Sequence, residues 1–470
     1  MKAKNLNILN KAVVLAAISL TLQGCFVAKT YERPTLEETQ NLYRTDQLPA
    51  DSLSMANVSW QDMFTDAHLK QYIQEGLENN IDIRIAIQQM TAAEAYLKQV
   101  KAEALPSIDV DASVTHYEIS KNSQFGQVYN RSSEQYALTT TLSWEANIWG
   151  KLRSGKRAYV ASYMQSMAAH QAVKTQLIAS IATAYYKLLA LDKDLEVTKQ
   201  TIANREKSVE TIKALKEAGQ VTQVAVDQNI AQYNNAKALQ VDIEMAIFRT
   251  ENVLSFLLGK APQHFERGTL ETQSINTGIK LGVPATLLSN RPDVMQAEYG
   301  LINAFELTNV ARTNFYPSFT LTATSGFQSI ELDKWLNTSS WFATFVGGLT
   351  QPIFNNRRIK TQYEIAKAQQ EQALLKFKQS LLLAGSDVSN ALYAYHAETE
   401  KFQYREKEVE ALRNAEANSD ELLKNGFGTY LDLLVARQTA LNSELNVIDS
   451  KLQQLLTVVN LYEALGGGWR

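Results

Sequence analysis

Four stretches of the chain alternate between apolar and polar residues, which is the pattern of β-strands with two unlike faces. They are 107–117, 136–148, 318–327 and, less regularly, 340–354. The polar positions of the first stretch include Asp109 and Asp111, and those of the second include Glu145 and Asn147. Because polar segments connect the stretches in pairs, the sequence predicts two β-hairpins, each with one apolar and one polar face.

Most of the remaining chain predicts helices of unusual length. Between residues 151 and 217, and again between 358 and 425, there is no proline and a single glycine. A helix of about 67 residues is roughly 100 Å long, which a globular domain seldom contains. Leu195, Ile202 and Val209 recur every seven residues, as in a coiled-coil seam, and charged residues such as Arg205 fill the gaps. The predicted fold class is mainly α, with a pair of β-hairpins.

The chain also repeats itself with a period of 207 residues. This shift superposes Lys151 on Arg358 and Gly219 on Gly426 without a gap, and both glycines stand where a helix would stop and reverse. Each half is predicted to contain a helix, a β-hairpin and a long helix pair. The predicted segments are a signal peptide 1–24, an irregular N-terminal segment 25–78, a first repeat 79–259 (hairpin 106–148, helix pair 151–259), a linker 260–290, a second repeat 291–466 (hairpin 316–354, helix pair 357–466) and a tail 467–470.

Cys25, the only cysteine, follows an N-terminal targeting segment. Three lysines precede the apolar run 12–20, which is too short to span a bilayer as a helix but has the form of a secretory signal. The sequence LQGC at 22–25 resembles a bacterial lipobox, in which a peptidase cuts before the cysteine and the cysteine then carries lipid. The alternative is an ordinary signal peptide with an incidental free cysteine. Because Phe26 is not the aspartate that usually retains such lipoproteins at the inner membrane, the outer membrane is favoured.

Composition argues against several other functions. The 46 basic and 49 acidic residues give a net charge of −3, so nothing indicates a nucleic acid partner. A single cysteine excludes an intrachain disulfide and a Cys-rich metal site, and the five histidines are not at metal-ligand spacing. No P-loop or GxSxG motif occurs, so neither a catalytic site nor a cofactor is predicted. Arg291 and Asp293 are interpreted as flanking a helix start at Pro292 rather than as a catalytic pair.

A series of motifs resembles the outer membrane factor family of TolC-like channels, in its OprM or NodT lipoprotein branch. They are WQDMFTDAHLKQYI (60–73), ENNIDIRIAIQQ (78–89), LPS (105–107), SWEANIWGKLR (143–153), LLSNRPDVMQAEYGLINA (287–304), FYPSFTLT (315–322), QPIFNNRR (351–358) and ALGGGW (464–469). The resemblance covers nearly the whole mature chain. It implies a homotrimer in which four strands from each copy close a 12-stranded transmembrane β-barrel, and in which the long helices form a coiled-coil α-barrel across the periplasm.

The resemblance also implies a function. The trimer would be the outer-membrane channel of a tripartite efflux system, a passive exit duct for drugs and other small molecules. Its partners would be outer-membrane lipid, a periplasmic adaptor (membrane fusion) protein and an inner-membrane pump of the RND type. One alternative with the same fold is the outer-membrane component of a type I protein secretion system. Another, of a different class, is a periplasmic coiled-coil scaffold without a pore, although alternating strands argue against it.

Three groups of residues would then have roles in the channel, the first taken from the polar face of the predicted strands, with an error in strand register as the alternative, and the other two from the resemblance. Asp109, Asp111, Glu145 and Asn147 would line the lumen of the duct, which must be polar so that solutes are not trapped. The turns of the two helix pairs would receive the adaptor. The residues expected there are Gly219, Val221 and Thr222 in the first repeat and Gly426, Gly428 and Thr429 in the second.

The third group is a periplasmic gate. Leu431 and Asp432 match the family's constriction, where three leucines would form an apolar plug and three aspartates an acidic ring. Val435 stands where relatives often have aspartate, so a second acidic ring is not implied. The alternative is that Leu431 packs within its own helix pair and that Asp432 is a solvated charge.

Overall fold

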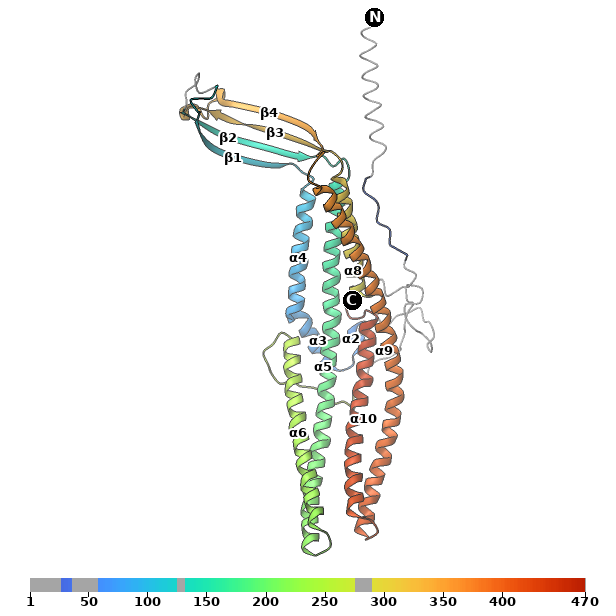
Figure 1. The fold of residues 1–470 in the computed structure, drawn as a ribbon. Coiled ribbons are helices and arrows are strands. Elements are labelled where there is room, and N and C mark those ends of the chain that lie inside the picture. Colours follow the sequence, from blue (N-terminus) through green and yellow to red (C-terminus); the bar gives the residue numbers. More distant parts are fainter. Residues whose placement is uncertain (1–26, 36–57, 125–131, 275–289, 470) are drawn as a thin grey trace. The chain divides into compact units, whose positions relative to one another are not determined.

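The computed structural model describes residues 27–35, 58–124, 132–274 and 290–469. The predicted signal peptide 1–24 and the lipidation candidate Cys25 lie outside these residues. The described chain is mainly helical with four antiparallel strands, which confirms the predicted fold class (Figure 1). It divides into two compact units. The first contains Met90–Gln165 and Ala297–Phe377, and the second contains Ser166–Gln296 and Lys378–Arg470. Each unit therefore takes residues from both sequence repeats.

The strands form one antiparallel sheet in the first unit. They are β1 (Ser107–Glu118), β2 (Ser132–Glu145), β3 (Ser318–Ser329) and β4 (Trp341–Thr350), side by side in that order (Figure 1). The register places apolar residues opposite apolar residues, because Ile108 lies opposite Leu142, and Leu142 lies opposite Ala323. A slip of one residue would exchange the faces, so this register fixes one apolar and one polar face. Within the described residues, β1 and β4 each have a neighbouring strand on one side only.

Two strands end earlier along the chain than the sequence predicted. The stretch expected to continue to residue 354 ends at Thr350, two residues before Pro352, which has no N–H to donate to a ladder. The stretch expected to continue to residue 148 ends at Glu145. The N–H of Ala146 still donates to the carbonyl of Phe319 (2.9 Å), but residues 146–150 are irregular, and α5 begins at Lys151.

The helices repeat with the period found in the sequence. The longest are α5 (Lys151–Glu217), α6 (Gln223–Leu257), α9 (Arg358–Lys424) and α10 (Tyr430–Ala464). A shift of 207 residues converts the bounds of α5 into those of α9, and those of α6 into those of α10. The others are α2 (Trp60–Met63), α3 (Ala67–Asn79), α4 (Ile81–Ala102) and α8 (Pro292–Thr313), with short 3-10 turns η4 (Leu332–Lys334) and η5 (Thr338–Ser340). No helix in the described ranges has the length and the apolar character needed to cross a membrane.

The core of the second unit is built around the middle of α5. Tyr185, Tyr186, Leu188 and Leu189 are at most 1% exposed. The ring of Tyr72 on α3 lies 6.2 Å from that of Tyr185. Because burying one such side chain stabilises a fold by roughly 1.5–3 kcal/mol, this cluster anchors α3 against α5.

The RPD and GGGW motifs meet in the second unit and are structural. Helix α8 begins at Pro292, as predicted, and Arg291 donates to the carboxylate of Asp387 (3.0 Å) and to the carbonyl oxygen of Ala464 (3.1 Å). A Cβ at Gly467 would lie 2.3 Å from the ring of Tyr462, so only glycine fits there. The two motifs therefore fasten the end of α10 to the start of α8.

Candidate functional site

Three of the predicted strand residues share the polar face of the sheet. Asp109, Asp111 and Glu145 lie opposite Thr141, Thr139 and Thr320, respectively. The hydroxyls of Thr141 and Thr324 lie 3.4 Å apart across the next ladder. Carboxylates and hydroxyls on one face, opposite a face of Ile, Val, Leu and Phe, give the sheet one side suited to water and one suited to an apolar surrounding.

Asn147, the fourth residue predicted for this face, is not on a strand. It follows the end of β2, and its side-chain oxygen accepts a hydrogen bond from the backbone N–H of Leu152 (3.0 Å) in the first turn of α5. A helix start leaves backbone N–H groups without partners, and a short polar side chain satisfies one of them. The strand prediction for Asn147 was wrong because helix capping takes this residue out of the ladder.

Two open turns connect the long helices, and each depends on glycine. Gly219 (φ 75°) and Gly426 (φ 78°) adopt the left-handed conformation, and nothing lies within 4 Å of a Cβ built on either. The N–H of Gln220 donates to the carbonyl of Leu215 (2.9 Å), the bond of a Schellman motif, and the second turn repeats it. The predicted docking residues Gly219, Val221, Thr222, Gly426, Gly428 and Thr429 all lie in these turns and are exposed or half-buried.

The predicted gate residues begin α10. The side chain of Leu431 is 55% exposed, whereas that of Leu433, two positions later, is buried. Asp432 completes a capping box with Thr429, in which the Thr429 hydroxyl accepts from the Asp432 N–H and the Asp432 carboxylate accepts from the Thr429 N–H, each at 3.2 Å. These hydrogen bonds lower the pKa of Asp432, so it is a fixed negative charge at the helix start.

Arg205, one of the charged residues that fill the gaps of the apolar seam, is buried between helices. It is only 7% exposed and donates to the backbone carbonyl of Gln232 on α6 and to the side chain of Gln438 on α10 (2.9 Å). Burial, and then the charge of nearby Arg437, lowers the pKa of Arg205. The residue lies three positions after Ile202, on the same helix face as the seam, and that spacing could have revealed its place.

Arg437 makes a second tie between the helix pairs. Its guanidinium donates to the hydroxyl of Ser208 on α5 (2.6 Å) and to the carboxylate of Asp420 on α9 (3.0 Å). Together, the two arginines connect α10 with α5 and α9 near the turns. No sequence motif singled out this pair, because the contacts of Arg205 with Gln438 and of Arg437 with Ser208 join residues more than 200 positions apart.

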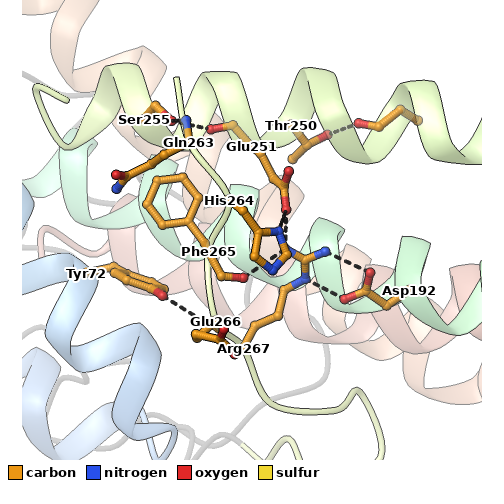
Figure 2. A network of polar contacts seen from close by, with 11 residues as sticks. Tyr72, Asp192, Thr250, Glu251, Ser255, Gln263, His264, Phe265, Glu266 and Arg267 are labelled. Carbon is orange, nitrogen blue, oxygen red and sulfur yellow. Dashed lines mark hydrogen bonds and ion pairs between the residues drawn. The ribbon is translucent and has the colours of Figure 1, made fainter. Parts of the chain in front are cut away.

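A buried ion cluster holds the segment that follows α6, here called the clamp segment (Gly259–Ser274). Figure 2 shows Arg267 of this segment between Asp192 of α5 and Glu251 of α6. The side chains of Arg267 and Glu251 are only 9% and 10% exposed, and Arg267 donates to Asp192 at 2.8 Å and to Glu251 at 2.6 Å. Burial alone would lower the pKa of Arg267, but the two carboxylates outweigh it and raise the pKa.

Several further contacts reinforce the clamp segment. Nδ1 of His264 shares a 2.8 Å hydrogen bond with Glu251, and the hydroxyl of Tyr72 donates to the carbonyl of Glu266 (2.6 Å) (Figure 2). The ring of Phe265 packs edge-on against Tyr72 at 5.3 Å. Within the described part of the chain, no group of three or more His, Cys, Asp or Glu residues is arranged to hold a metal ion. The ion pairs of Arg267 with Asp192 and Glu251 make the cluster a structural tie between the segment and both helices.

Comparison with known proteins places the chain in a family. The model of the family described as outer membrane efflux protein matches residues 72–260 and 283–467. The chain belongs to this outer membrane efflux protein family. Members are outer-membrane channels of efflux pumps and not enzymes, which confirms the function and the localisation predicted from the resemblance.

The relatives match over nearly their whole length. The solvent efflux pump outer membrane protein SrpC of Pseudomonas putida is 28% identical over 457 residues, which is 96% of this chain and 97% of SrpC. The probable outer membrane lipoprotein SilC of Salmonella typhimurium is 25% identical over 454 residues, 95% of this chain and 96% of SilC. A crystal structure of a membrane protein from Pseudomonas aeruginosa superposes with a TM-score of 0.85 at 25% identity, covering 94% of this chain and 97% of that one.

Proposed function

We propose that three copies of this efflux channel protein form one passive exit duct for small molecules. The observation that carries the proposal is the four-stranded sheet with one apolar face, one polar face and, within the described residues, two unpaired edges. Unpaired backbone groups are not tolerated in lipid, so the edges β1 and β4 need partners. In a trimer, β4 of one copy pairs with β1 of the next, and twelve strands close with their polar faces inward.

The lumen is then lined by Asp109, Asp111 and Glu145 together with the threonines of the same face. A wall of hydroxyls and carboxylates lets polar solutes pass without holding them. Lipid attached at Cys25 anchors the chain in the outer membrane. The sequence LQGC and the name of SilC as a lipoprotein support this assignment.

The gate is assigned to Leu431 and Asp432. The exposure of Leu431 in the single chain supports this, because an apolar side chain left outside its own helix pair is available to a second copy. Three such leucines would exclude water, and three Asp432 carboxylates would favour cations. The capping box fixes where the carboxylates point.

Docking of a periplasmic adaptor is assigned to the two open turns, and an inner-membrane pump of the RND type would supply the energy. Because Cys25 is the only native cysteine, a single cysteine introduced at Thr222 gives a specific crosslinking site. We expect Thr222→Cys to crosslink to the adaptor in cells. Lys199→Cys is the control, because Lys199 lies on α5 of the same helix pair but away from the turn, and we expect it not to crosslink. Equal crosslinking at both positions would contradict docking at the turn.

The duct itself is tested by mass and by conductance. The purified protein should be a trimer by native mass spectrometry, and in planar bilayers Leu431→Ala should open more often and conduct more than the unmodified protein. The matched control is Val224→Ala, because Val224 is the residue 207 positions earlier and is also exposed (63%). A monomer would refute the trimeric duct. Equal conductance of Leu431→Ala and Val224→Ala would refute the gate.

A further inference from the structure

A hollow of about 390 Å³ lies at the base of the sheet in the first unit. Its wall includes Glu145, Trp149, Lys151, Tyr316, Thr350 and Arg358. Glu145 and Thr350 belong to the polar face of the sheet, since Thr350 pairs with Ser318 in the register that places Thr320 opposite Glu145. The hollow therefore opens where the polar face ends and helices α5 and α9 begin. Its volume falls in the range of sites for small organic molecules.

One side of the hollow is a rigid aromatic wall. The rings of Trp149 and Tyr316 lie 5.2 Å apart with an interplanar angle of 33°. The indole N–H of Trp149 donates to the carbonyl of Pro317 (2.6 Å), which fixes the plane of the ring. Tyr316 remains 40% exposed. A further planar ring can therefore extend this stack without rearranging it, which is how aromatic pairs bind planar molecules.

The lining also carries an uncompensated positive charge. Nζ of Lys151 lies 3.0 and 3.1 Å from the two carboxylate oxygens of Glu145, so these two charges neutralise each other. The guanidinium of Arg358 forms no hydrogen bond or ion pair with any described residue. Arginine binds carboxylate, sulfonate and phosphate groups through two parallel N–H donors. The free charge of the hollow is therefore one arginine.

We propose that this hollow is a binding site for small aromatic anions, held by stacking on Trp149 and Tyr316 and by an ion pair with Arg358. The assignment deepens the proposed function, because only a polar face that lines a duct would meet such solutes during export. It names the ligand class of the hollow alone, planar organic acids of one or two rings, and it predicts that the hollow binds cations of the same shape more weakly.

The test is equilibrium dialysis of the full-length protein in amphipol, with 1-naphthalenesulfonate as the probe. Its cationic counterpart, 1-naphthylmethylammonium, is compared at the same concentration and ionic strength. We expect the sulfonate to bind at least tenfold more tightly than the ammonium. Arg358→Gln should weaken sulfonate binding about tenfold, as the loss of one hydrogen-bonded charge implies, and should leave ammonium binding unchanged.

Two matched variants separate the site from general effects. Arg357→Gln removes the neighbouring arginine, which does not line the hollow and lies 3.8 Å from Glu364, so it should not change sulfonate binding. Trp149→Leu should weaken sulfonate binding severalfold, whereas Trp144→Leu, which alters a tryptophan outside the hollow, should not. Equal losses in Arg357→Gln and Arg358→Gln, or tighter binding of the ammonium, would overturn the proposal.

The proposed duct is judged on the same preparation by its mass and conductance. A trimer that conducts but does not bind the sulfonate refutes only the anion site. A monomer that binds the sulfonate through Arg358 refutes only the duct.

Discussion

Loss of the Arg267 side chain should release the clamp segment while leaving the rest of the second unit folded. Arg267→Met keeps most of the apolar stem and removes the charge that faces Glu251 and Asp192. Breaking a buried ion pair by removing one partner costs about 3–5 kcal/mol, because the other charge remains buried. Asp192 is 37% exposed and is rehydrated easily, so the lower end, about 3 kcal/mol, applies here.

The assay is hydrogen–deuterium exchange measured by mass spectrometry on peptides covering Phe265–Gln273. The amide of Gly268 is a direct reporter, because it donates to the hydroxyl of Tyr185 (3.1 Å) when the segment is in place. A local cost of about 3 kcal/mol corresponds to exchange faster by about 150-fold, since 1.4 kcal/mol is a factor of ten. Peptides from the α5–α6 turn should not change.

Lys193→Met is the matched control. Lys193 also ties α5 to the segment, through Glu271 (2.8 Å), but the two side chains are 29% and 56% exposed. An exposed pair contributes about 0–1 kcal/mol, so exchange should accelerate less than about fivefold. Adding Glu251→Gln to Arg267→Met should recover part of the loss, because the unpaired buried charge is removed. Similar exchange in the Arg267 and Lys193 variants would refute the buried-charge explanation.

Three further predictions concern single residues elsewhere. Thr429→Ala removes a capping box and should lower the free energy of unfolding, measured by urea titration, by about 1 kcal/mol. Thr222→Ala is the control, because Thr222 begins the equivalent helix without a side-chain cap bond, and it should change this free energy by less than half as much. Arg357→Gly should stabilise the protein by about 1 kcal/mol in the same assay, because Arg357 has φ 64°, a conformation that costs an L-residue energy and glycine none. Burial, and then the charge of Asp449, raises the pKa of Asp194 to about 7, so the folded state binds a proton that the unfolded state loses near pH 4. The stability of the fold should therefore fall as the pH rises from about 4 to about 7. Asp194→Asn should flatten this part of the pH profile of thermal unfolding.

Periodicity predicted the strands and the long helices, because each rests on a local pattern, but α2 and most of α3 lie in the segment 25–78, which was predicted to be irregular. The long helices follow from the lack of proline and the seam of apolar residues, and the 207-residue repeat reappears in the bounds of α5, α6, α9 and α10. The alternation of the strands gave the correct faces, with Asp109 and Glu145 on the polar side. Local patterns fail at the ends of elements, where capping competes with pairing, and this is why Asn147 was misplaced.

The ties between helices were not predictable from the sequence alone. Arg205 and Arg437 contact residues more than 200 positions away on other helices, and no local spacing encodes such partners. The clamp segment lay in the predicted irregular linker, where nothing distinguished Arg267 from any exposed arginine. Its two carboxylate partners lie on α5 and α6, and only the packing of these helices brings them together.

The two helix turns have the same backbone conformation but different side chains, and this difference bears on where a gate can be. The shift of 207 residues superposes the left-handed glycines and their Schellman bonds, so the backbone of the turn is common to both repeats. The same shift places Val224 and Ala225 of the first turn on Leu431 and Asp432 of the second. Only the second turn has both a capping box and a fixed negative charge at its helix start. In its first turn α6 has no carboxylate, and its first acidic residue, Asp227, lies two positions beyond the equivalent of Asp432. The acidic ring of the proposed gate, at the positions of Leu431 and Asp432, therefore comes from the second repeat.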